Sequence, residues 1–299
     1  MIPRMTAVIE ASGLRKRFGK VNALDGLDLS VSPGEVHGFL GPNGAGKSTT
    51  IRILLGLMKS SGGSVRVLGK DPWTDAVELH RELAYVPGDV ILWPNLSGGE
   101  TIDLLAGLRG GADAALRARL VKDFDLDVRK KGRSYSKGNR QKVALIAAFA
   151  RPASLYVLDE PTSGLDPVME SVFRSEVARV TAGGATVLLS SHILSEVEEL
   201  CDRVTIIRSG VAVEHGSLAN LRHLRSTAFS VVTDAPEVAL SAVAGVSHVR
   251  REGDALLFDV ETDATHGVLA ELARHRVDTL TVTPPSLEEL FLRHYGDKA

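Results

Sequence analysis

A glycine-rich loop that ends in lysine constrains the fold of this chain more than any other stretch. Residues 41–49 read GPNGAGKST and match the phosphate-binding pattern G-x-x-x-x-G-K-[ST]. The apolar run 36–40 predicts a short buried strand, and the run 50–58, rich in Ile and Leu, predicts a packed helix. Because strand, loop and helix come in the order that phosphate binding requires, we interpret the loop as a phosphate site rather than an ordinary turn.

Each residue type in the loop has a physical role. Glycines let the backbone turn tightly, so that successive N–H groups point at phosphate oxygens. The N-terminus of the next helix adds partial positive charge, the lysine adds a full charge, and the serine hydroxyl can bind Mg²⁺. The predicted nucleotide-binding residues here are Gly41, Pro42, Asn43, Gly44, Ala45, Gly46, Lys47, Ser48 and Thr49.

Composition argues against several other classes of protein. The chain has 299 residues, enough for one large and one small domain, and its net charge of −2 gives no overall basic field for holding a nucleic acid. Its single cysteine, Cys201, rules out an internal disulfide and fits a reducing cytosol. No apolar run reaches the length of about 18 residues that a membrane span needs, so we expect that the chain does not cross a membrane by itself.

Strand and helix signals alternate along most of the chain, which predicts an α/β cassette with a mainly parallel sheet covered on both faces. We expect two strands of an antiparallel edge sheet at 7–14 and 27–31, joined by a polar loop at 15–22. A helical insertion is expected from about 88 to 153, and the cassette extends to about residue 224. The other expected elements are strands at 65–68, 83–86, 155–158 and 185–189 and helices from about 74 and at 143–150.

Residues 225–299 have a different pattern and predict a smaller second domain. Strand and helix signals follow the order β-α-β-β-α-β, which is the ferredoxin-like split motif of an α+β domain. The segment 284–286, PPS, then precedes a last amphipathic helix. No cluster of catalytic residue types is found there, and we favour a dimerising or regulatory role over a ligand-sensing one. The apolar positions of the last helix are Leu287, Leu290, Phe291 and Tyr295.

Two carboxylates follow a second buried strand. The apolar run 155–158 ends in Asp159 and Glu160. Carboxylates at the tip of a buried strand are costly unless they bind something, and a phosphate-bound Mg²⁺ shared by Ser48 and Asp159 would offset that cost. Because alternate strand residues face opposite sides, we expect Glu160 to point toward a water that attacks the terminal phosphate. The alternative is that both carboxylates form ion pairs with loop arginines.

A histidine follows the next buried strand. Ser190, Ser191 and His192 come directly after the run 186–189, and the carboxyl ends of such strands line the ligand crevice. His192 could therefore contact the terminal phosphate and fix the attacking water. A lone histidine is, however, more often a structural residue.

Together these residues resemble the nucleotide-binding subunit of ATP-binding-cassette (ABC) transporters, over about residues 8–224. The segment 161–166, PTSGLD, is similar to the family's D-loop, which ends in Asp166. Phe18 matches the aromatic residue that stacks on adenine, and His192 stands at the position of the switch histidine. The resemblance implies ATP and Mg²⁺ as cofactors. The residues that it implies to be catalytic are Lys47, Glu160 and His192.

One segment retains only part of the family's signature. Residues 135–139, YSKGN, lie where the signature LSGGQ belongs, just before a predicted helix. Ser136 and Gly138 are retained, and the resemblance implies that they contact the γ-phosphate across a dimer interface. Without the family, the same segment is an ordinary polar N-cap with basic neighbours.

A second segment lacks a side chain that the family uses at the metal. Residues 85–89 read YVPGD, and Gly88 stands where the family usually has glutamine. Glycine cannot reach the metal or the attacking water. We hypothesise that Asp89, the nearest polar side chain, or a water molecule substitutes for it.

The resemblance also implies partners and a location. The altered segments and the ending PSLEELF at 285–291 are similar to the drug-exporter branch, with daunorubicin- and tetronasin-type ATPase subunits. We expect an ATPase that forms a homodimer around ATP, docks on a separate ABC-2-type permease at the cytoplasmic face of the cell membrane, and powers export. The stretch 91–96, around Trp93, is either the docking site or part of the insertion's own core. The alternative function is a soluble ABC-type ATPase without a role in transport.

Overall fold

The computed structural model describes residues 7–218, 220 and 227–283. The chain divides into two compact units between His215 and Gly216, and each unit is described by itself. The domain boundary expected at residue 224 lies outside the described residues. So does the amphipathic helix expected after the segment 284–286.

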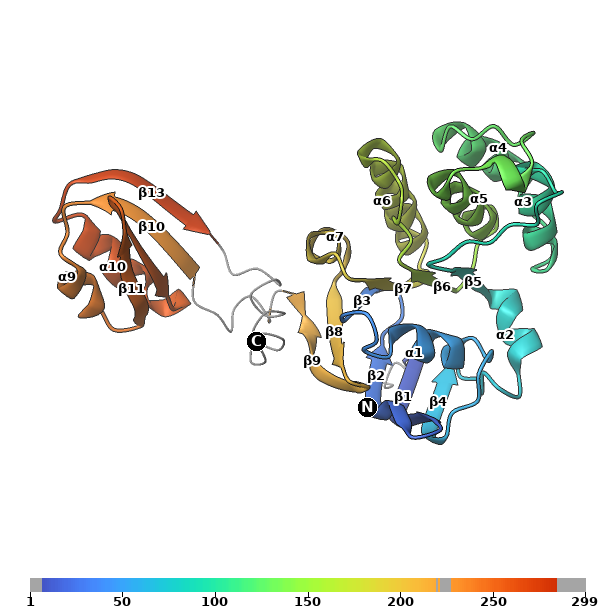
Figure 1. Cartoon of the computed structure of the whole chain (residues 1–299), viewed down its shortest axis with the longest axis horizontal. Helices are drawn as coiled ribbons and strands as arrows, with labels where there is room; N and C mark the ends of the chain where they lie inside the picture. Colours follow the sequence, from blue (N-terminus) through green and yellow to red (C-terminus); the bar gives the residue numbers. More distant parts are fainter. Residues whose placement is uncertain (1–6, 219, 221–226, 284–299) are drawn as a thin grey trace. The chain divides into compact units, whose positions relative to one another are not determined.

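A six-stranded sheet forms the centre of the first unit, with the strand order β5-β6-β7-β3-β8-β9 (Figure 1). The pairs β5–β6, β6–β7, β3–β7 and β3–β8 are parallel. Every residue of β3 and β6 is buried, as expected for parallel strands covered on both faces. The carboxyl ends of β6, β7 and β3 therefore meet at one edge. The strands are β3 (Val36–Leu40), β5 (Leu83–Val86), β6 (Leu155–Asp159), β7 (Thr186–Ser191), β8 (Arg203–Arg208) and β9 (Val211–Ser217).

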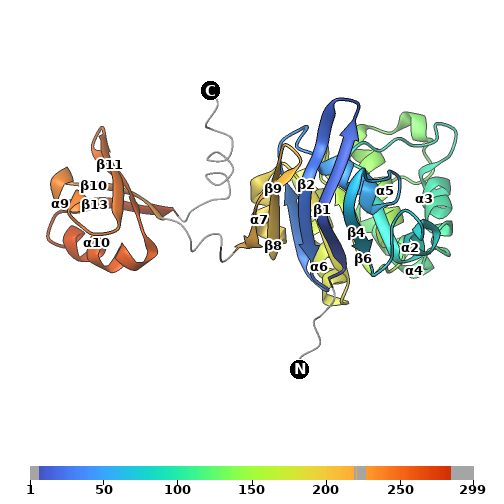
Figure 2. The ribbon, with the colours of Figure 1, turned by 90° about the horizontal axis from the view of Figure 1, so that it is seen from below.

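A second, antiparallel sheet contains β1 (Ile9–Phe18), β2 (Val21–Val31) and β4 (Gly62–Val67) in the order β2-β1-β4. In Figure 2 the strands β1 and β2 lie in front of the rest of the unit. The polar loop expected at 15–22 is wrong, because β1 and β2 continue to a tight turn and Phe18 still pairs with Val21. This end of the hairpin is mostly exposed, so its side chains carry no apolar alternation although the backbone pairing continues, with a register shift after Lys16, to Phe18.

The helices surround the six-stranded sheet. Helix α1 contacts strands of both sheets. Helices α3, α4 and α5 form the expected helical insertion and group together in Figure 1. Helix α5 begins six residues earlier than expected, because Ser136 caps a polar first turn whose side chains give no helical apolar pattern. The helices are α1 (Lys47–Leu54), α2 (Ala76–Glu82), α3 (Gly98–Gly107), α4 (Ala114–Asp123), α5 (Lys137–Phe149), α6 (Pro167–Ala182) and α7 (Leu194–Leu200).

The C-terminal unit has the expected β-α-β-β-α-β order and a four-stranded antiparallel sheet ordered β11-β12-β10-β13. Its apolar core includes Phe229 and Phe258, whose rings stack with centroids 5.4 Å apart. The ferredoxin-like prediction is therefore confirmed. The elements are β10 (Thr227–Thr233), α9 (Glu237–Ser241), β11 (Val246–Glu252), β12 (Ala255–Val260), α10 (Thr265–Leu272) and β13 (Val277–Thr283).

A buried carboxylate joins the helical insertion to the core of the first unit. Glu176 on α6 accepts hydrogen bonds from Arg119 on α4 at 2.7 and 2.9 Å and from Arg179 at 2.8 Å. Burial alone would raise the pKa of the Glu176 carboxyl, but the two guanidinium groups together hold that pKa below its ordinary value.

We expect Glu176→Gln to lower the free energy of unfolding by about 1–3 kcal/mol at pH 7, because two guanidinium groups lose a charged acceptor. Since the pKa of Glu176 is lowered in the folded state, this contribution is present above the ordinary glutamate pKa near 4.3 and is lost as the pH falls through the folded value. Urea unfolding at several pH values measures it. The control is Glu78→Gln, at an exposed ion pair with Lys70. A stability difference that stays constant from neutral to strongly acidic pH would contradict this account.

Candidate nucleotide-binding and catalytic site

The glycine-rich loop connects β3 to α1 and encloses its own lysine side chain. Lys47 is buried, and its Nζ donates hydrogen bonds to the carbonyl oxygens of Gly41 and, at 3.3 Å, Pro42. Burial lowers the pKa of the Lys47 ammonium, while the negative charges of Glu160 and Asp159 act in the opposite direction. The ammonium and the two carboxylates therefore lie within electrostatic reach of one another.

The glycines of the loop are required by its geometry. A Cβ at Gly41 would lie closer than 3.0 Å to the carbonyl oxygen of Ile207. Gly46 has φ +116°, and a Cβ there would lie 2.8 Å from the carbonyl oxygen of Ala23. Gly44, with φ +80°, also adopts the left-handed conformation. Helix α1 then begins without a side-chain cap, so no capping side chain competes for its first N–H groups.

The carboxylate of Asp159 is buried at the end of β6. Burial raises the pKa of this carboxyl and the charge of Glu160 raises it further, while the Ser190 hydroxyl and the Lys47 charge lower it. Lys47 and Arg52 are the positive charges that favour the ionised form of this carboxyl. In the described part of the chain, no three His, Cys, Asp or Glu side chains form a metal site.

Glu160 lies just beyond β6, outside the strand. Its backbone has φ +46°, and its N–H donates to the carbonyl oxygen of Ser190 at 2.9 Å. Its Oε1 lies 3.1 Å from Nδ1 of His192. The expected strand alternation is therefore the wrong reason for the orientation of Glu160, which follows from a left-handed backbone conformation. Among the described residues, its ion-pair partner is His192 and not a loop arginine.

The signature segment and the D-loop of the same chain are in direct contact. Lys137 Nζ donates to the Ser163 hydroxyl at 2.6 Å. A Cβ at Gly138 would lie closer than 3.0 Å to the carbonyl oxygen of Gly164. Only glycine at position 138 allows this close approach, so the start of α5 and the D-loop are held as one surface.

Two of the predicted nucleotide-binding residues cap helices. The Ser136 hydroxyl accepts a hydrogen bond from the Asn139 N–H at the start of α5. The Asp166 carboxylate accepts hydrogen bonds from the Val168 and Met169 N–H groups, both at 3.0 Å, at the start of α6. Capping explains these residue types locally, and a nucleotide contact by Ser136, Gly138 or Asp166 stays a prediction.

Position 88 lies against the backbone at the end of β6. A Cβ at Gly88 would lie 3.2 Å from the carbonyl oxygen of Asp159 and 3.6 Å from Cβ of Glu160. A longer side chain at this position would therefore begin beside Asp159 and Glu160. Asp89 is exposed and lines a separate pocket with Arg140, so its role as a metal ligand stays a prediction without a supporting contact.

Phe18 occupies the last position of β1 and is exposed. The ammonium of Lys16 lies 5.2 Å from the centroid of its ring, a cation–π distance. The ring is thus accessible to solvent, as stacking on a base requires. Its contact with adenine remains a prediction.

Two residues near the site, Tyr85 and Arg52, were not predicted from the sequence. Burial raises the pKa of the Tyr85 phenol to about 12, and the charge of Asp159 adds to this shift. Arg52 also acts electrostatically on Asp159. Arg52 follows Ser48 by one helical turn on α1, and this spacing could have predicted from the sequence that Arg52 lies near the site. Tyr85 is near the site only because β5 pairs with β6, which no local pattern reveals.

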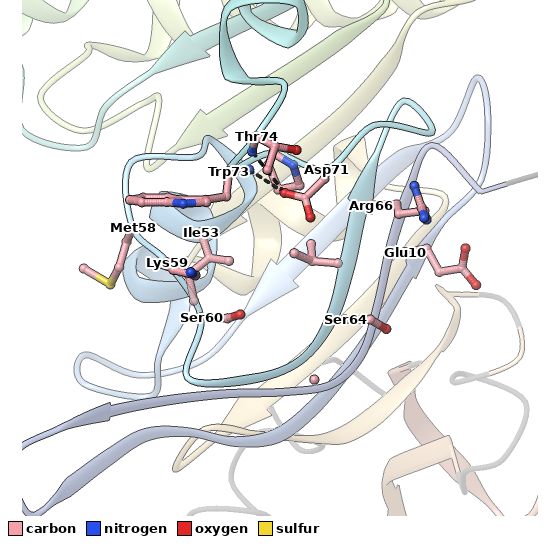
Figure 3. A pocket seen from close by; sticks show the side chains of 13 residues that line it. Glu10, Ile53, Met58, Lys59, Ser60, Ser64, Arg66, Asp71, Trp73 and Thr74 are labelled. Atoms are coloured by element: carbon pink, nitrogen blue, oxygen red, sulfur yellow. Dashed lines mark hydrogen bonds between the residues drawn. The ribbon is translucent and has the colours of Figure 1, made fainter.

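A polar pocket of about 540 Å³ lies between the end of α1 and the edge strand β4 (Figure 3). The indole of Trp73 covers one side of it above Ile53 and Met58. Asp71 fixes the Trp73 loop by accepting hydrogen bonds from the Trp73 and Thr74 N–H groups at 2.8 and 3.2 Å. None of the predicted nucleotide-binding residues lines this pocket, so it is separate from the predicted nucleotide site.

An apolar groove of about 350 Å³ lies beside the insertion. Ile91 is 84% exposed and Trp93 is 49% exposed, whereas Leu92 between them is buried. All three residues line the groove, and of the three Ile91 and Trp93 expose the most apolar surface. Other apolar residues that line the groove are Leu55, Leu57, Pro87, Val90, Leu105 and Leu108.

Two family models match this chain. The model for the ABC transporter family matches residues 24–163. The model for the C-terminal domain of DrrA1-3-like ATP-binding proteins matches residues 216–295. The second match begins at the residue where the second compact unit begins.

The chain is similar to ATP-binding proteins of known transporters. Daunorubicin resistance ATP-binding protein DrrA2 of Streptomyces coeruleorubidus is 34% identical, over 97% of this chain and 95% of that protein. Bacitracin transport ATP-binding protein BcrA of Enterococcus faecalis is 33% identical, over 76% of this chain and 75% of that protein. A solved structure of the ATP-binding subunit of an ABC transporter has a TM-score of 0.68 and 32% identity, over 73% of this chain and 92% of its own.

We expect Gly138→Ala to separate the signature segment from the D-loop, because the new Cβ would collide with a backbone oxygen that cannot rotate away. Overpacking of this kind lowers the free energy of unfolding by about 1–3 kcal/mol. ATPase activity should fall while the isolated chain still binds nucleotide. Gly107→Ala in α3 is the matched control, since a Cβ there meets nothing within 4 Å. Equal effects of the two substitutions on ATPase activity would contradict the close contact.

Proposed function

The chain belongs to the ABC transporter family as an ATP-binding subunit with ATPase activity, and we propose that it powers the export of a drug or antibiotic through a separate membrane permease. The observation that carries the proposal is the cluster at the sheet edge, where the buried Lys47 ammonium is within electrostatic reach of Asp159 and of Glu160, which is paired with His192. The names of two relatives, a daunorubicin resistance protein and a bacitracin transport protein, support the substrate class.

In the proposed reaction, the loop N–H groups and Lys47 hold the phosphates of ATP. Ser48 and Asp159 are the residues that would hold Mg²⁺, which neutralises charge on the phosphates when bound. Glu160 accepts the proton of the attacking water at its carboxylate. His192 donates a hydrogen bond from Nδ1 to Oε1 of Glu160 in the tautomer that carries the proton there, which keeps that carboxylate oriented.

The proposed site is completed by a second copy of the chain. Each ATP would lie between Lys47 of one copy and Ser136 of the partner subunit, related by a two-fold axis. The contact between Gly138 and Gly164 supports this arrangement, because it presents the start of α5 and the D-loop as one surface. ATP would stabilise the closed dimer, and hydrolysis would remove the shared γ-phosphate and release it.

The apolar groove beside the insertion is the proposed docking site for the permease. In the part of the chain that the structure describes, no helix has both the length and the apolar character to cross a bilayer. Ile91 and Trp93 expose apolar surface in a groove that an amphipathic helix of a membrane protein could fill. The chain would then act at the cytoplasmic face of the membrane.

Glu160→Gln tests the proposed chemistry, because it removes the proton acceptor while keeping the shape of the side chain. We expect ATP hydrolysis to fall at least about 100-fold, ATP binding to persist, and dimers to accumulate with ATP. Phosphate release and light scattering after gel filtration measure these effects. The control is the exposed residue Glu252, as Glu252→Gln. A Glu160→Gln protein that hydrolyses ATP normally, or stays monomeric at saturating ATP, would contradict the proposal.

A cysteine at position 91 tests the docking site. In a chain carrying Cys201→Ala, Ile91→Cys with a short thiol-reactive cross-linker should join the chain to a polytopic membrane protein in native membranes. Val238→Cys is the matched control, because Val238 is 78% exposed and lies in the other unit. Absence of a membrane-protein adduct at position 91, or equal adducts at both positions, would argue against docking in this groove.

A further inference from the structure

Strand β13 forms one edge of the C-terminal sheet, next to β10 (Figure 1). All seven of its residues are exposed, and in the described part of the chain its outer side pairs with no strand. Its sequence, VDTLTVT, consists mostly of β-branched and apolar residues, and its only charged residue is Asp278. Such an edge is a template for pairing with another strand.

The opposite edge of the same sheet is protected. Strand β11 carries Arg250, Arg251 and Glu252, all of them in ion pairs. It also contains an irregularity at His248, which has φ +53°. Charges and bulges are the usual means of preventing strand addition. The two edges of this sheet therefore differ. Residues 279–283 of β13 have neither charged side chains nor a bulge to prevent strand addition.

The two faces of β13 differ in chemistry. Leu280 is paired with Val231 and Val282 with Phe229, so both lie on the face that carries the apolar core. Yet Leu280 is 41% exposed and Val282 is 47% exposed. The other face of the strand carries the threonines at 279, 281 and 283. The core thus continues onto β13 but is incompletely covered there.

We propose that β13 is the surface through which the C-terminal units of two copies pair, as antiparallel strands about a two-fold axis at Thr281. The inference rests on the homodimer of the proposed function. In this register Thr281 faces Thr281 of the partner subunit, and Leu280 faces Val282 of the partner subunit. Directly opposed residues share a face, so apolar side chains meet on one face and threonines on the other. The paired residues 279–283 include no charge.

Other symmetric registers fit less well. An axis at Leu280 places Val282 opposite Asp278 of the partner subunit, which sets a carboxylate against an apolar side chain. An axis at Val282 leaves only three described residues paired. A slip of one residue sets Leu280 opposite Thr281 of the partner subunit and moves the apolar side chains to opposite faces. The sequence of β13 therefore favours one self-complementary pairing.

This contact is too small to hold two copies together by itself. Five paired residues on each strand bury far less than the roughly 1,200–2,000 Å² of a stable interface. The ATP-bridged cassettes would raise the effective concentration of the second strand, and strand pairing would add to the avidity of the whole dimer. A second copy of the chain is therefore the partner that we expect at β13, because the proposed ATP-bridged dimer already brings two copies together.

A single cysteine at the axis tests the register. Thr281→Cys in the full chain carrying Cys201→Ala should form an intermolecular disulfide under mild oxidation with ATP present, seen as a dimer on a non-reducing gel. Opposed Cα atoms in antiparallel strands lie about 4.5–5.5 Å apart, within disulfide range. Thr279→Cys is the matched control, because its two copies would lie about 13 Å apart along the strands. Thr279→Cys mixed with Thr283→Cys should again form the disulfide.

The outcomes separate this inference from the proposed function. Equal disulfide formation by Thr281→Cys and Thr279→Cys alone would show random collision and overturn it. A Thr281→Cys protein that forms ATP-dependent dimers by mass but no disulfide also overturns it, and leaves the proposed function intact. If instead deleting residues 284–299 is needed to make the Thr281→Cys thiol reactive, that segment covers the edge and the inference fails. If the Thr281→Cys protein forms the disulfide but has no ATPase activity, that result contradicts the proposed function and leaves the pairing of β13 intact.

Discussion

Two oppositely charged groups buried at the edge of the parallel sheet determine how the rest of the cassette is arranged. The pKa of Lys47 is lowered and the pKa of Asp159 is raised, in each case mainly by burial, so the fold disfavours the charged form of both. A nucleotide phosphate and a divalent cation would stabilise these charges where water cannot. The covered parallel sheet, the glycines of the loop and the left-handed conformation at Glu160 all serve to bring these groups together.

Contiguous motifs could be predicted well from the sequence, and contacts between distant segments could not. The loop around Lys47 and the pair Asp159–Glu160 are local patterns whose chemistry needs no knowledge of the fold. The hairpin end at 15–18 was missed because its side chains are mostly exposed, although its backbone pairs with β2 as far as Phe18. Tyr85 was missed because it reaches the site only through the neighbouring strand.

The altered motifs have different structural meanings. The signature segment differs from the family pattern in three positions but retains Gly138, the one residue whose lack of a side chain the D-loop requires. Gly88 is different, because a side chain there would begin against the backbone of Asp159 and Cβ of Glu160, and glycine supplies none. Asp89 lines another pocket, and its role as a substitute for the missing side chain stays a prediction. The signature segment thus keeps the glycine that its contact with the D-loop requires, whereas position 88 offers no side chain to the site.

Each proposed catalytic site contains residues of two copies of the chain. Mixing two inactive variants tests this arrangement most directly. Lys47→Ala damages one half of each site and Ser136→Ala the other. In a mixed dimer one site would carry both substitutions and the other would be intact. Random mixing in equal amounts should therefore restore about a quarter of the wild-type ATPase activity, although each variant alone is inactive. A mixture no more active than the separate variants would contradict the shared site.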